Sequence, residues 1–108
     1  LVMAVHESPL AQPKNIFFGH ILSALSGVLI YLFLGMSFLS IGLAVAISVW
    51  AMMITKTIHP PAGANPIIAI LGGKEISFIL LPVATGALII IVFAVIYNKI
   101  LNRNYPKK

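Results

Sequence analysis

The chain has 108 residues, of which 60% are hydrophobic and 8% charged, with a formal net charge of +5. Soluble domains carry about a quarter charged residues, so this composition excludes a water-soluble fold and indicates one integral membrane domain, residues 1–108, in contact with the lipid bilayer. The seven cations lie at the ends of apolar segments, which argues against nucleic acid as a partner, and the lack of cysteine excludes disulfides and thiolate metal sites.

The chain opens with a short apolar segment and a polar connector. Residues 1–5 are far shorter than the about 20 residues that cross a bilayer, and we interpret them as the remnant of a transmembrane helix whose beginning is missing. The connector, residues 6–15, contains two prolines, which are poorly tolerated inside helices. Asn15 at its end is a suitable N-cap for the helix that follows.

Three apolar segments have the length of complete transmembrane helices, and they run from about 16–34, 39–55 and 76–97. A tight turn joins the first two, which should form an antiparallel hairpin. Gly19, Ser23 and Gly27 recur every four residues, a pattern that lets helices approach closely in lipid. We expect this face to be a contact of a homo-oligomer. In the last span, Pro82 predicts a kink.

The longest interruption lies between the second and third spans and reads Thr57-Ile58-His59-Pro60-Pro61-Ala62-Gly63-Ala64-Asn65-Pro66. The apolar segment after it, residues 66–73, would be about 12 Å long as a helix and is too short to cross. We therefore expect an all-α membrane bundle with three complete crossings and a re-entrant half-helix, the alternative being a short surface helix. This topology puts residues 1–15 and 56–75 on one side, where the two proline-rich connectors can meet, and the C-terminal tail on the other.

The central loop predicts a site for a small anion. Non-helical backbone at membrane depth persists only where it is buried in protein or lines a cavity, and a half-helix starting at Pro66 would direct free amides into the loop. The alternative is that the prolines only end a helix and His59 binds a freed carbonyl. The candidate substrate-binding residues are Lys56, Thr57, His59, Pro60, Pro61, Gly63, Ala64 and Asn65 in the loop, His20 in the first span, and Ser8 and Gln12 in the first connector.

His20 lies inside the first span, where titratable groups are costly and usually face the bundle interior. It could guard a pathway or relay a proton, or it could only hydrogen-bond a neighbouring helix. The three histidines are scattered along the sequence, so we predict no metal site. The chain has no aspartate and its two glutamates lie at interfaces, so no catalytic set is visible, and we expect neither enzyme activity nor a cofactor.

Five motifs follow one another along the chain: Ser8 to Asn15, Gly19 to Ala24, Thr55-Lys56-Thr57 before His59 to Ala64, Leu71-Gly72-Gly73, and Arg103 to Pro106. In this combination, which covers nearly the whole chain, the sequence resembles the HPP family of integral membrane proteins. The resemblance implies four transmembrane helices, the first of which would be missing here. It also implies nitrite transport, as in plastid and cyanobacterial members, and a location in a bacterial plasma membrane or plastid envelope.

We therefore predict the transport of a small monovalent anion, nitrite above others. In this hypothesis Lys56 attracts the anion, amides near Gly63 to Asn65 replace part of its hydration, and His59 and His20 donate hydrogen bonds or carry a coupling proton. The alternatives are a channel or carrier for another small solute and a membrane scaffold that transports nothing. The lack of membrane-embedded carboxylates argues against a cation pathway.

Overall fold

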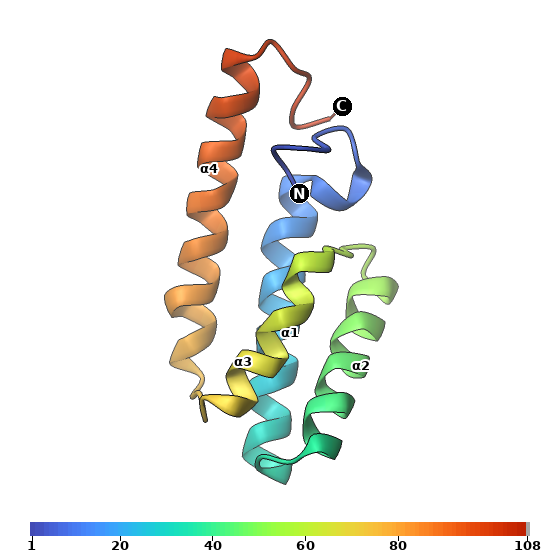
Figure 1. Ribbon diagram of the computed structural model, residues 1–108, viewed down its shortest axis with the longest axis vertical. Coiled ribbons are helices and arrows are strands. Elements are labelled where there is room, and N and C mark those ends of the chain that lie inside the picture. The colour runs from blue at the N-terminus through green and yellow to red at the C-terminus, as the bar shows by residue number, and fades with distance from the viewer. Residues whose placement is uncertain (108) are drawn as a thin grey trace.

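The computed structural model describes residues 1–107, which form helices and connecting turns but no strand. Four α-helices and three shorter helical segments follow one another along a molecule whose longest dimension is 47 Å (Figure 1). In chain order they are η1 (Pro9–Ala11), α1 (Pro13–Leu34), α2 (Phe38–Ile54), η2 (Pro60–Ala64), α3 (Asn65–Leu71), η3 (Ile79–Ala84) and α4 (Thr85–Ile100).

Two helical stretches are long and apolar enough to cross a membrane: α1, and the joined η3 and α4, each with 22 residues. At 1.5 Å per residue, 22 residues span about 33 Å, close to the thickness of the hydrocarbon core. The prediction of three complete crossings was wrong for the second span. α2 has only 17 residues because the helix ends at Ile54, and Lys56, with a φ of 58°, turns the chain back toward α1.

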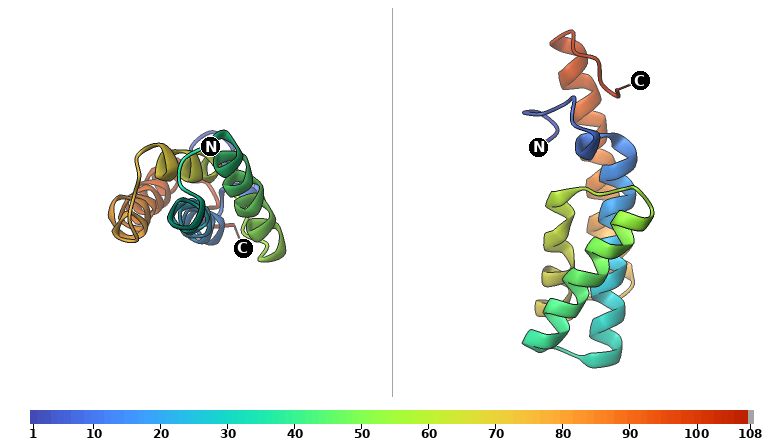
Figure 2. Two further views of the ribbon diagram at one scale, coloured as in Figure 1. Left: turned by 90° about the horizontal axis from the view of Figure 1, so that it is seen from below. Right: turned by 90° about the vertical axis from the view of Figure 1, so that its right-hand side faces the viewer.

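The chain forms four helical segments that run in alternating directions along the long axis, which we call legs, and not three crossings with a re-entrant half-helix (Figures 1 and 2). α1 leads away from the chain ends, α2 returns, η2 with α3 leads away again, and α4 returns. The far end of α3 lies where α1 ends, because a Cβ built on Gly73 would be 2.9 Å from the Tyr31 hydroxyl. The half-helix therefore does not leave on the side where it begins. Residues 55–64 form the apex of a hairpin that packs against α1.

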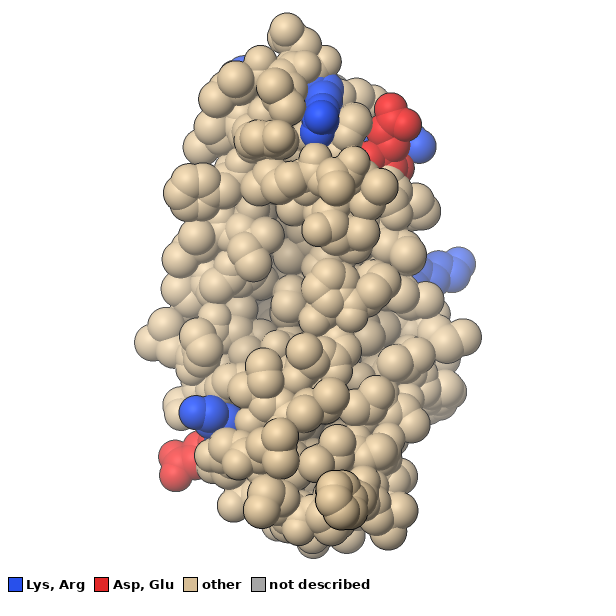
Figure 3. Space-filling model, viewed as in Figure 1, with Lys and Arg blue, Asp and Glu red and all other residues tan. Residues whose placement is uncertain are grey.

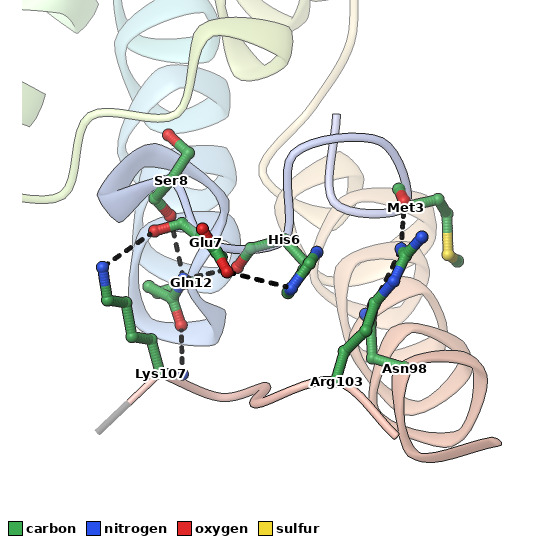
Figure 4. Close-up of polar contacts among 8 residues, drawn as sticks. All are labelled: Met3, His6, Glu7, Ser8, Gln12, Asn98, Arg103 and Lys107. Atoms are coloured by element: carbon green, nitrogen blue, oxygen red, sulfur yellow. Dashed lines mark hydrogen bonds and ion pairs between the residues drawn. The ribbon is translucent and has the colours of Figure 1, made fainter. Parts of the chain in front are cut away.

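The C-terminal tail lies against the N-terminal connector, although the sequence predicted opposite sides (Figure 4). The Tyr105 hydroxyl donates to the Ala11 carbonyl at 2.7 Å, and Arg103 donates to the Met3 carbonyl at 2.8 Å. The reason is that η2 and α3 add a fourth leg, which returns α4 to the end where the chain begins. Most charged side chains consequently lie toward the two ends of the molecule, and the broad surface between them is uncharged on this face except for one blue side chain at its right edge (Figure 3).

The small-residue face of α1 packs inside the chain, which contradicts the predicted oligomer contact. A Cβ on Gly27 would lie 2.6 Å from the Cα of Pro66 and 2.9 Å from the Cβ of Ala69. Ser23 is fully buried. The small residues therefore accommodate α3 of the same chain, and this face is not available to a second copy.

The last helical stretch is broken near its start, as Pro82 predicted. Leu81 has non-helical angles (φ −133°, ψ 121°), so the chain is kinked within the segment Ile79–Ala84. Proline lacks an N–H and clashes with the preceding turn, so it interrupts the helical hydrogen bonds. Beyond the break, α4 buries Ala87 and Ala94 against the bundle and exposes large apolar side chains such as Phe93.

Candidate functional site

Two imidazole rings, from segments 39 residues apart in sequence, meet inside the bundle. His20 comes from α1 and His59 from the end of the loop before η2, and their ring centroids are 5.2 Å apart in an edge-to-face arrangement. His59 is only 4% exposed. Its Nδ1–H donates to the Leu10 carbonyl at 2.8 Å, so the two proline-rich connectors meet here, as the sequence predicted.

Gly19 allows this approach. A Cβ at Gly19 would lie 2.9 Å from the Thr57 carbonyl oxygen and 3.0 Å from the His59 Cβ, so any larger residue would push the loop away from α1. Asn15 fastens the same loop by donating its side-chain amide to the Ile58 carbonyl at 2.7 Å. Asn15 is therefore not the predicted cap, since α1 already begins at Pro13. Together these contacts hold His59 beside His20.

Asn65 fixes the other side of the His20 ring. Its amide nitrogen lies 2.7 Å from Nδ1 of His20 and donates to the Ser23 hydroxyl at 3.0 Å. With the amide nitrogen as donor, Nδ1 accepts and the proton of a neutral ring lies on Nε2. His59 has the reverse arrangement, because its Nδ1 donates and its Nε2 then carries the lone pair. The site thus combines one donor and one acceptor on adjacent rings.

Two hollows adjoin the histidine pair. One has a volume of about 220 Å³ and is lined by His20 and Asn65 together with apolar residues of α3, η3 and α4. The other has a volume of about 180 Å³ and is lined by His20, His59 and Pro61. His20 and Ile90 line both. Among residues 1–107 no side-chain nitrogen or oxygen is both buried and unpaired, so the Nε2 atoms, which have no hydrogen-bond partner in this part of the chain, are not fully buried.

Comparison with known proteins places the chain in a family. The family model described as the HPP transmembrane region matches residues 1–106. The chain belongs to the HPP family. Two transmembrane proteins of Dictyostelium discoideum are each 36% identical to it over 115 residues, which cover 98% of this HPP chain and 40% and 37% of the relatives. The chain thus spans about two fifths of the length of the curated relatives it matches, and no solved structure matches it.

Family membership and the two membrane-length helices identify the HPP chain as an integral membrane protein. Its His59-Pro60-Pro61 tripeptide begins η2: His59 occupies the cap position and the prolines occupy the first turn. A helix start is where proline costs least, because the first N–H groups have no helical partner. The prolines therefore begin a helix that continues into α3 and do not only end one, whereas the other part of the alternative, a hydrogen bond from His59 to a backbone carbonyl, is present as the contact with Leu10.

The continuous helix changes the role predicted for the loop amides. The Asn65 N–H donates to the Ala62 carbonyl and is not free for an anion. Ala64 is exposed and Gly63 partly exposed, and neither lines the two hollows at the histidine pair. The side chain of Asn65, by contrast, lies at the site.

The remaining predicted residues lie around the histidine pair rather than in it. Lys56 is exposed, Pro60 is exposed, and buried Thr57 pairs its hydroxyl with that of Thr55 at 2.7 Å. Ser8 caps η1 by accepting from the Leu10 N–H at 3.1 Å. Gln12 is engaged in the connector and tail, because its amide donates to the Ser8 carbonyl at 2.8 Å and its oxygen accepts from the Lys107 N–H at 2.7 Å.

Sequence reasoning missed the residues that hold and enclose the histidines. Asn15 and Ser23 were interpreted as a cap and a packing residue, and Ile90 had no distinguishing feature in an apolar run. Across the described part of the chain, no group of three or more His, Asp or Glu side chains is placed to hold a metal ion. Two imidazoles and an amide, without a carboxylate in either hollow, can donate and accept hydrogen bonds and move a proton between ring nitrogens.

Proposed function

We propose that this HPP chain carries a small monovalent anion, nitrite above others, across a bacterial plasma membrane or plastid envelope. The observation that carries the proposal is the position of His20, which lines two adjacent hollows and whose Nε2 has no hydrogen-bond partner among the described residues. A titratable side chain inside a transmembrane helix is expensive and usually marks a pathway. The family match supports a membrane role, while nitrite itself comes from the resemblance described above.

The chemistry of the hollows favours an anion over a cation. Their polar groups are His20, His59 and Asn65, and the other lining residues are apolar. A neutral His20 offers an Nε2–H donor to an anionic oxygen. If the Nε2 of His59 takes up a proton, the second ring becomes a donor as well and offsets the cost of a bare negative charge at low dielectric. An anion and a proton would then travel together.

Residues outside the hollows have supporting roles in this proposal. Exposed Lys56 raises the local concentration of anions without binding them directly. The tail end of the molecule faces the cytoplasm, because four of the described cations, Lys14, Lys99, Arg103 and Lys107, lie at that end, whereas Lys56 follows α2 and Lys74 lies at the opposite end. A homo-oligomer remains part of the proposal, with its contact on the exposed faces of α2 or α4 instead of the buried face of α1.

The test is uptake of labelled nitrite into proteoliposomes that contain the full chain, with and without an inwardly acidic or alkaline pH gradient. We expect uptake that responds to the gradient, that falls at least about tenfold in His20→Ala or His59→Ala, and that changes only slightly in Lys56→Ala. His6→Ala is the matched control, since His6 lines neither hollow. Absence of nitrite uptake by the unmodified chain would reject nitrite, and equal losses in all three histidine variants would reject the site.

A further inference from the structure

A third hollow lies at the end of the molecule opposite the tail. It has a volume of about 370 Å³ and is formed by the turn between α3 and η3 and by the start of η3. Lys74, Glu75 and Ser77 supply its polar groups. In Figure 3 one blue and one red side chain interrupt the uncharged surface at the lower left, near this turn. We call this hollow the polar mouth.

The three hollows form a row along one side of η3 and α4. The hollow at His59 and the middle hollow share His20 and Ile90, and the middle hollow and the polar mouth share Phe78 and Pro82. The first also includes Leu1 and Val2, near the chain ends. The row thus leads from the end that holds the N-terminus to the end that holds Lys74 (Figure 1).

Phe78, together with Pro82, lines both the middle hollow and the mouth. Its side chain is buried with Val83, Ala24 and Val28 in an apolar cluster, and the Lys74 ammonium lies over its ring at 5.9 Å from the centroid. The backbone break at Leu81 lies next to Pro82. Non-helical backbone at membrane depth persists where it lines a cavity, and an apolar constriction blocks ions by excluding water.

We infer that the three hollows are one passage and that Phe78 is its gate toward the Lys74 end. The inference rests on the proposed function for the identity of the ion, but its geometry is independent of that identity. Lys74, held above the ring, attracts anions to the outer side of the gate, whereas His20 receives them on the inner side.

The lack of native cysteines allows a direct test with thiol chemistry in the full chain. Gly86→Cys puts a thiol in the middle hollow, where a Cβ meets nothing within 4 Å, and Gly42→Cys is the matched control on the exposed face of α2, with equal space but no hollow. The probe is an anionic, membrane-impermeant methanethiosulfonate added on the Lys74 side of proteoliposomes. Such reagents need a thiolate, which forms in water and not in lipid.

We expect slow modification of Gly86→Cys, none of Gly42→Cys, and an about tenfold faster reaction when Phe78→Leu is added, because the smaller side chain opens the constriction to water. Thermal unfolding of the double variant checks that the fold is retained. In a second measurement that keeps Phe78, Lys74→Gln should slow the anionic reagent and speed a cationic one.

The outcomes separate the passage from the transported ion. An unreactive Gly86→Cys, or a rate that neither Phe78→Leu nor Lys74→Gln changes, would overturn the inference even if nitrite transport were present. The expected thiol pattern without any nitrite uptake would uphold the passage and overturn the proposed function instead.

Discussion

α1 meets its neighbours in two different ways. Toward α3 its glycines bring backbones into contact, and a Cβ on Gly27 would be 2.6 Å from the Pro66 Cα. Toward α4 it faces hollows, and a Cβ on Gly86 would meet nothing within 4 Å. Seen along the long axis, α4 lies to one side of the other three helices (Figure 2). One side of α1 therefore positions the histidines, and the other side leaves room for what they bind.

The largest loss of stability should come from adding a methyl group on the side of α1 that packs closely against α3. Gly27→Ala forces α1 and α3 apart, because the nearest obstacle is the backbone of Pro66 and not the end of a side chain that can move. We expect the free energy of unfolding to fall by about 3 kcal/mol, measured by denaturant titration in detergent micelles. A loss below the error of the measurement would mean that the two helices are not packed this closely.

Removing the hydrogen bonds that Asn65 of α3 makes to α1 should cause the next largest loss of stability. Asn65→Ala leaves the Ser23 hydroxyl and Nδ1 of His20 without their donor and should cost about 1–2 kcal/mol. A double-mutant cycle with Ser23→Ala isolates the pairwise term, for which about 0.6–1.7 kcal/mol is expected in a membrane protein. Strict additivity of the two substitutions would show that the hydrogen bond contributes nothing.

At the end of the molecule that holds the tail, α1 and α4 are held together by the docked tail. Loosening the tail should lower the free energy of unfolding by a smaller amount. Tyr105→Phe removes the hydrogen bond to the Ala11 carbonyl and should cost about 1 kcal/mol. Burial raises the pKa of Tyr105 from 10.0 to about 12. Since the folded pKa lies above the unfolded one, this contribution is complete below pH 10 and is lost as the pH rises toward 12.

Alkaline titration of tyrosinate absorbance should therefore show one tyrosine that ionises late and is missing from Tyr105→Phe. If the tyrosine that Tyr105→Phe removes from the titration does not ionise late, the tail is not docked in solution.

The smallest change in stability, and one of opposite sign, is expected for Gly86, which lies where α1 and α4 are separated by a hollow. Gly86→Ala adds a methyl group where there is space and replaces the poorer helix former, so unfolding should become harder by at most about 1 kcal/mol. Paired with Gly27→Ala, it tests the contrast between the two sides of α1 with the same chemical change. Equal destabilisation by both would remove the contrast.

The sequence predicted the helices better than their number of crossings. Long apolar runs and the turn at Gly35 are local properties, and they gave the first hairpin and the last span to within a few residues. The legs were miscounted because a helix was expected to start at Pro66, whereas it starts with Pro60 and Pro61 as η2. The spacing of Gly19 and Gly27 correctly indicated close approach but could not name α3 as the partner.

The site was predicted only in part, because its unusual residues are visible in the sequence but the contacts between distant segments are not. His59 and His20 are recognisable because polar groups in apolar surroundings are rare. The partners of His20 are not, since Asn65 and Ser23 meet only through the packing of α3 on α1, 42 positions apart in sequence. Lys56 was included because it is near His59 in sequence, but the turn with positive φ leaves its side chain exposed.

The docking of Tyr105 on Ala11 and of Arg103 on Met3 ties the last residues of the chain to the first. A circular permutant is therefore feasible, with a short linker from residue 107 to residue 1 and new ends cut at Gly35, where a Cβ would meet nothing within 4 Å. All four legs would keep their neighbours in this permutant, yet both chain ends would be on the opposite face of the bilayer.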